Sequence, residues 1–151
     1  MTRSKRMKPV VKVAGERERN AARVLGECRR RLAEQEEKLR QLQVYREDYA
    51  RQFQDAAGQG LGAARLQDYR SFLARLNEAI RQQQQVVEQQ RAECARQQDR
   101  WRDTRTHAKA LDKVVERYRS EEHRMASRRE QHDSDERAAR GARCRDREDE
   151  E

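Results

Sequence analysis

Apolar residues recur along most of the chain at alternating spacings of three and four, the pattern of helices that pack through a heptad seam. From Leu66 a single heptad frame runs without a break to Tyr118. Its a positions are Leu66, Leu73, Ile80, Val87, Cys94, Trp101, Ala108 and Val115, and its d positions are Tyr69, Leu76, Gln83, Gln90, Gln97, Thr104, Leu111 and Tyr118. The first half has its own frame, with Val11, Leu25, Leu32, Leu39 and Phe53 at a, and Ala14, Ala21, Cys28, Leu42 and Tyr49 at d. This pattern predicts an all-α protein with two long coiled-coil helices, over about residues 11–54 and 63–118.

The stretch "DAAGQGLGAA" between the two frames contains Gly58, Gly60 and Gly62, three of the six glycines in the chain. Glycine suits a helix C-cap and a tight reversal but is a poor residue inside a helix. We therefore expect an antiparallel two-helix hairpin that turns at about residues 55–62, in preference to one long helix that dimerises in parallel. Such a turn places Leu42 opposite Leu76, Leu39 opposite Ile80, Leu32 opposite Val87, Gln35 opposite Gln83, and Cys28 near Cys94.

Pro9 and the charged ends set the expected limits of the hairpin. Proline is compatible with the start of a helix but not with its interior, so residues 1–9 are expected to form a basic N-terminal tail. The coiled-coil hairpin then covers residues 10–119, and residues 120–151 form a charged, disordered tail, with some fraying helix early in it as the alternative. Helix two overruns helix one in this arrangement, which leaves an apolar stripe at Leu111, Val114, Val115 and Tyr118. An exposed helical stripe suits insertion into a groove or ring on another protein, and a fraying helix end is the alternative.

Phe72 lies beside the seam, at a g position, because Leu73 occupies the a position. Ala79 is the next g position of the same helix, and Tyr45 is the matching g position of helix one. Together with the seam residues Leu42, Tyr49, Leu76 and Gln83 they predict a widened apolar patch close to the turn. A two-stranded coiled coil has no third layer to cover such a patch, so a partner is the preferred explanation. The alternative is that Phe72 lies across Leu76 and thickens the seam.

The composition agrees with a coiled coil and narrows the function. Charged residues make up 42% of the chain and hydrophobic residues 34%, too few for a layered globular core. The net charge of +8 comes from basic and acidic residues that are interspersed along the chain, as on a solvated helix face. Nucleic acid is therefore not expected as a partner, although a nucleic-acid-binding helical arm or a passive scaffold remains the alternative function. No apolar run is long enough for a membrane span, and no apolar segment follows the basic start, so a cytoplasmic location is expected.

Nothing in the chain indicates catalysis, a metal or a cofactor. His107, His123 and His132 have no metal-ligand spacing and no neighbouring nucleophile, and the three cysteines have no metal-ligand spacing either. "GQGLG" has no preceding strand and lacks the spacing of a phosphate-binding loop. The prediction is a protein that acts by binding other proteins, with no enzymatic activity.

Three segments carry a resemblance to a known family: "AARVLGECRR" in helix one, "LQVYREDY" before the turn and "YRSFLARLNEAI" after it. Over about residues 10–125 the chain resembles the flagellar type III export protein FliJ family. The resemblance implies a cytoplasmic accessory that looks like the central two-helix stalk of rotary ATPases. It implies insertion of the terminal end of the hairpin into the hexameric flagellar export ATPase ring, which promotes ring assembly and activity. That role is assigned to Leu111, Val114, Val115 and Tyr118.

The resemblance further implies that the turn end binds the large membrane subunit of the export gate, and that the protein holds empty export chaperones. The gate-contact pattern falls on Phe72, Leu76, Ala79 and Gln83, and on Leu42, Tyr45 and Tyr49 of helix one. Membrane association would then be peripheral and only through partners. Two positions depart from the family pattern, because Lys38 stands where glutamine is common and Gln83 where histidine is common.

Overall fold

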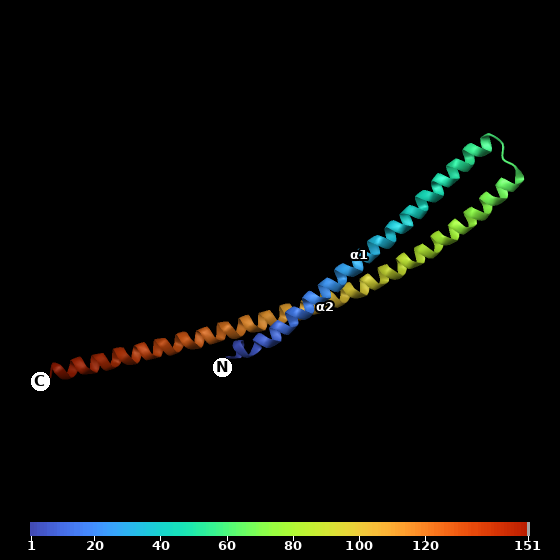
Figure 1. The fold of residues 1–151 in the computed structure, drawn as a ribbon. Helices are drawn as coiled ribbons and strands as arrows, with labels where there is room; N and C mark the ends of the chain where they lie inside the picture. The colour runs from blue at the N-terminus through green and yellow to red at the C-terminus, as the bar shows by residue number, and fades with distance from the viewer. Residues whose placement is uncertain (151) are drawn as a thin grey trace. The chain divides into compact units, whose positions relative to one another are not determined.

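Two helices account for nearly all of the chain in a computed structural model, which describes residues 1–150 (Figure 1). Helix α1 spans Arg3–Gly58 and helix α2 spans Ala63–Glu148. No strand occurs among residues 1–150, so the expected all-α class and helical hairpin are confirmed. No helix in this range combines the length and the apolar character that crossing a membrane requires.

The connection between the helices lies where the glycines predict it. Gly58 ends α1, and Gly60 has a φ of +90°, the left-handed conformation that residues with a side chain adopt only at a cost. The amide groups of Gln59 and Gly60 donate to the carbonyls of Ala56 and Ala57 at 3.1 and 3.2 Å and so close the last turn of α1. The chain then reverses, and α2 begins at Ala63.

The helical residues form two compact units, each built from both helices. The turn unit comprises Glu18–Thr104, and the terminal unit comprises Met1–Arg17 with the residues from Arg105 onward. The seam of the turn unit buries Ala21, Leu25, Cys28, Leu76, Ile80, Val87 and Cys94. All seven are a or d positions of the predicted frames, so the heptad pattern identifies this core correctly.

Polar contacts fix the register within the turn unit. The Gln83 side-chain amide donates to the backbone carbonyl of Gln35 at 2.9 Å and to its side-chain oxygen at 2.8 Å. Trp101 Nε1 donates to a carboxylate oxygen of Glu18 at 2.9 Å. A slip along the seam would break these bonds and leave polar groups unpaired, so they favour one register.

Both ends of the hairpin differ from the expectation. Residues 1–9 are not a tail, because α1 begins at Arg3 and passes through Pro9. Proline removes the hydrogen bond to the carbonyl four residues earlier, but two contacts support this first part of α1. The Lys5 amide donates to Thr2 Oγ1, an N-cap bond of 3.4 Å, and Ser4 bonds to Glu122 of α2.

The predicted disordered tail over residues 120–151 is helical over its described part up to Glu148. It is rich in alanine, arginine and glutamate, which favour helices without any tertiary contact. Arg140 pairs with Glu136 one turn earlier at 3.8 Å, and the basic residues Arg145 and Arg147 lie in the last turn, where they complement the helix dipole. Local helix preference therefore outweighs the lack of apolar residues in this segment.

Candidate partner-binding surfaces

The first candidate surface is an aromatic cluster in the turn unit, made of Tyr45, Tyr49, Phe53, Tyr69 and Phe72. The rings of Phe53 and Tyr69 are stacked with their centroids 3.6 Å apart, and Tyr49 stacks on Tyr69 at 5.2 Å. Phe72 contacts Tyr49 at 4.5 Å and meets the edge of Tyr45 at 6.0 Å. The five rings come from both helices, so the cluster ties α1 to α2 just before the turn.

Phe72 is half-buried, because the two tyrosines of α1 cover part of its ring. It therefore contributes to the contact between the helices through these two tyrosines. Tyr45 is the ring that the cluster leaves open, with 52% of its surface exposed. A large ring that is half free and held in place by neighbouring rings is a favourable anchor for a partner.

The other residues predicted for this surface divide between seam and edge. Leu76 is only 6% exposed and belongs to the core. Gln83 is half-buried and its amide is engaged by Gln35. Leu42 and Ala79 are half-buried at the edges of the seam, where part of each side chain remains accessible.

A surface groove of about 480 Å³ joins several of these residues beside the cluster. It is lined by Lys38, Gln41, Leu42, Tyr45 and Gln83. The sequence analysis assigned Leu42, Tyr45 and Gln83 to this surface. Lys38 is one of the two positions that depart from the family pattern. Gln41 was not predicted for this surface, because it lies off the seam at a heptad position that usually faces solvent. The groove places an ammonium group next to the exposed tyrosine, which suits a partner with both apolar and acidic groups.

A second groove, of about 300 Å³, lies on the turn side of the cluster and was not predicted. Tyr49, Phe53 and Tyr69 line it together with Leu61, and Arg65 and Asp68 border it, with Gln52 and Ala56 completing the wall. Phe53 and Tyr69 were assigned to the seam by their heptad positions, and the heptad pattern gives no sign that their rings also face a groove.

The second candidate surface, in the terminal unit, differs from the predicted apolar stripe. Val115 is buried, and Leu111, Val114 and Tyr118 are half-buried rather than uncovered. The reason is the early start of α1, which brings residues 3–17 against this part of α2. The guanidinium of Arg3 lies over the Tyr118 ring at 5.8 Å, a cation–π contact.

Ser4 anchors the start of α1 to α2. Its amide donates to Glu122 at 3.0 Å, and its hydroxyl donates to the other carboxylate oxygen at 2.7 Å. The backbone amide first, and then the hydroxyl, hold the pKa of the Glu122 carboxyl below its ordinary value. Ser4 itself is buried, the one polar residue in the described part of the chain with so little exposure.

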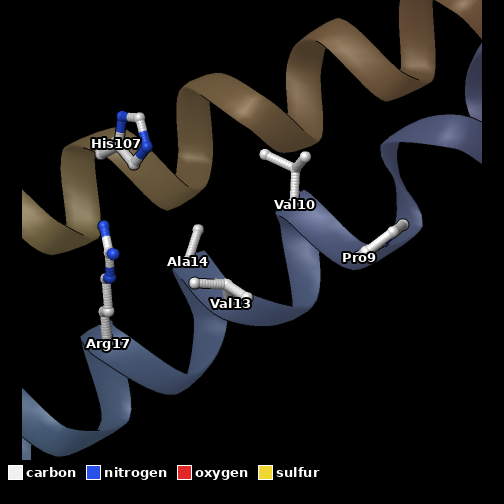
Figure 2. A pocket seen from close by; sticks show the side chains of 6 residues that line it. All are labelled: Pro9, Val10, Val13, Ala14, Arg17 and His107. Atoms are coloured by element: carbon white, nitrogen blue, oxygen red, sulfur yellow. The ribbon is translucent and has the colours of Figure 1, made fainter.

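One exposed apolar surface of the terminal unit lies on α1, beside the pairing with α2. Val10 and Val13 are each 46% exposed and line a groove of about 310 Å³ with Pro9, Ala14, Arg17 and His107. Figure 2 shows Val10 and Arg17 reaching toward the segment of α2 that carries His107. The heptad pattern gives no sign of this groove, because Val10 and Val13 lie off the seam positions Val11 and Ala14.

Metal-binding geometry occurs once among residues 1–150. Ligand atoms of His132, Asp133 and Glu136 lie within 4.8 Å of one another, and all three residues are exposed on α2. Histidine and carboxylate groups one helical turn apart are common on a charged helix, and Glu136 also pairs with Arg140. The group has no buried polar neighbour that would orient a ligand.

Comparison with known proteins relates the chain to one family. The family model described as the flagellar FliJ protein matches residues 3–147. The flagellar FliJ protein of Escherichia coli (strain K12) is 29% identical over 123 residues, which cover 82% of this chain and 84% of that protein. No solved structure gave a significant match.

Proposed function

The chain belongs to the flagellar FliJ protein family and is thus related to flagellar export, and from this we propose that it links the export ATPase to the export gate. In this proposal the terminal unit binds the hexameric flagellar export ATPase and promotes assembly and activity of its ring. The aromatic cluster and its groove bind the large membrane subunit of the gate, and the protein also holds empty export chaperones. It acts in the cytoplasm and reaches the membrane only through these partners.

The half-exposed ring of Tyr45 carries the gate part of the proposal. The ring is preorganised, since Phe72 supports one edge, and it borders a groove that contains Lys38 and Leu42. Binding to a rigid ring costs little conformational entropy, and aromatic anchors beside pockets dominate many interfaces. The gate surface therefore centres on Tyr45, with Phe72 and Tyr49 as its support.

For the ATPase, the proposal rests on the groove at Val10 and Val13. The surrounding part of α1 has Arg3, Lys5, Arg6, Lys8, Lys12 and Arg17, with Glu16 as its single acid between Arg3 and Arg17. Apolar residues within a basic helix suit a partner surface that is apolar and acidic. Leu111, Val114, Val115 and Tyr118 act indirectly, because they hold this part of α1 in place.

Two truncations test the assignment of the ATPase to the terminal unit. A chain that ends at Lys109 lacks the α2 segment that pairs with residues 3–17, and we expect it to lose ATPase binding and keep gate binding. A matched chain that ends at Met125 keeps the pairing, including Ser4 with Glu122, and removes only the exposed end of α2. It should bind the ATPase normally. Equal ATPase binding by both truncations would exclude the terminal unit as the site.

A further inference from the structure

Two of the three cysteines face each other across the seam of the turn unit. Cys28 of α1 and Cys94 of α2 are only 6% and 8% exposed. The Cys94 thiol donates a hydrogen bond to Cys28 Sγ, with the two sulfur atoms 2.7 Å apart. Both thiols are free, as is Cys144, which is exposed on α2 in the terminal unit. The structure thus brings together two sulfurs whose residues are 66 positions apart in the sequence, on opposite sides of the turn.

The surroundings of the two thiols protect them from large reagents and keep the two sulfur atoms next to each other. The Gln90 side-chain amide also donates to Cys28 Sγ, at 3.3 Å, so this sulfur accepts two hydrogen bonds. Burial, and next the hydrogen bond to Cys28, raises the pKa of the Cys94 thiol to about 11. Cys94 therefore stays protonated at neutral pH and reacts slowly with electrophiles from solution. Neighbouring seam residues Leu25 and Val87 are buried as well, so access is limited to small molecules.

We propose that Cys28 and Cys94 are an oxidation site at which a hydroperoxide converts the thiol pair into a disulfide that joins α1 to α2. The Cys28 sulfur attacks one peroxide oxygen and the O–O bond breaks, which forms a sulfenic acid on Cys28. The other oxygen takes up the Cys28 thiol proton and leaves as an alcohol or water. The Cys94 sulfur then attacks the sulfenic sulfur and expels hydroxide, which takes up the Cys94 proton and leaves as water. Two thiols and one hydroperoxide give one disulfide, one water and one alcohol, or two waters with hydrogen peroxide.

The cross-link would close a loop that contains the aromatic cluster and the turn. It would hold the two helices of the turn unit together without changing the surface that the cluster presents. A disulfide between segments far apart in sequence stabilises a fold by restricting its unfolded chain. The inference rests on the pairing of the two sulfurs alone and does not depend on the proposed function.

The test uses the full chain with Cys144→Ser, which leaves only the buried pair. After treatment with hydrogen peroxide we expect a monomer lighter by about 2 Da, with no thiol that alkylates after unfolding. The thermal midpoint should rise by about 5–15 °C and return when a dithiol reductant is added. The natural chain is treated in parallel, and oxidation of its exposed Cys144 shows that the peroxide was active.

Single-cysteine controls separate a disulfide from other oxidation. Cys28→Ala and Cys94→Ala, each combined with Cys144→Ser, should show no rise in the thermal midpoint on oxidation. The proposal is overturned if both buried thiols stay reduced while Cys144 is oxidised. It is also overturned if the pair gains oxygen atoms in place of losing two hydrogens, or if the oxidised single-cysteine controls show the same rise.

Discussion

Tyr45→Ala separates what the aromatic cluster contributes to folding from what it contributes to binding. Aromatic side chains bury about 150–250 Å² when fully covered, so a ring that is 52% exposed leaves about 100 Å² for a partner. At about 25 cal/mol per Å² this area is worth at most about 2.5 kcal/mol. After the costs of ordering the interface we expect a loss of about 1.5–2 kcal/mol, a 10- to 30-fold rise in Kd.

The effect of Tyr45→Ala on folding should be smaller. The ring makes an edge contact with Phe72, and such a pair is worth about 0.5–1.5 kcal/mol. We expect the free energy of unfolding to fall by about 1 kcal/mol and the thermal midpoint by about 2–4 °C. Phe72→Ala is a poorer probe, because Phe72 contacts both Tyr45 and Tyr49 and its loss should cost about 2–3 kcal/mol.

The assay is calorimetric titration of the chain with the cytoplasmic linker of the gate subunit, alongside circular dichroism melting. Val44→Ala is the matched control, since Val44 is 41% exposed and lies outside the aromatic cluster. It should leave Kd unchanged within about twofold, which is about 0.4 kcal/mol. If Tyr45→Ala binds as tightly as Val44→Ala, the ring is not an anchor and the reasoning about this surface fails.

Three further predictions concern stability. Replacing Gln35 and Gln83 together by leucine should raise the free energy of unfolding by about 1–2 kcal/mol, because apolar packing replaces a half-buried amide pair. A lower free energy of unfolding, measured by urea denaturation, would contradict this. Pro9→Ala should increase amide-exchange protection across residues 3–17 by at least about tenfold, because alanine restores the backbone hydrogen bond that proline cannot donate. Unchanged protection would show that the missing bond does not set the stability of this part of α1. The contact of Glu122 with Ser4 lowers the carboxyl pKa from its ordinary 4.5, so its stabilisation holds above that pH and is lost as pH falls through the folded-state pKa. The protection factor of the Ser4 amide, which compares its exchange with that of an unstructured peptide at the same pH, should therefore fall on acidification, and a Glu122→Gln variant whose protection factor shows the same pH dependence would refute this origin.

The seam and its register could be predicted because they depend on a periodic pattern with few competing solutions. Once three glycines fixed the turn, Gln35 had to meet Gln83, and Cys28 had to approach Cys94. Both contacts are present. A shift of one position along either helix would have placed polar side chains in the seam, so the pattern excludes nearby registers.

The ends could not be predicted from the same pattern, because their structure depends on contacts that local rules do not contain. Pro9 argues against a helix by itself, and the structure shows what supports residues 3–8 in helical form, namely the N-cap bond of Lys5 to Thr2 and the bonds between Ser4 and Glu122. Val10 and Val13 flank the seam positions Val11 and Ala14, and the heptad pattern does not show that the two valines border a groove. For the aromatic cluster, the heptad frame identified the rings but not that Tyr45, rather than Phe72, remains the most accessible.

The turnover of the flagellar export ATPase, with and without this chain, tests the central claim most directly. Turnover is followed over a range of ATPase concentrations at physiological salt, with the chain that ends at Lys109 as the control. We expect the full chain to stimulate turnover, most strongly at low ATPase concentrations where ring assembly limits the rate, and the truncated chain to have no effect. An ATPase whose turnover is the same with and without the folded, helical full chain would contradict the proposed function.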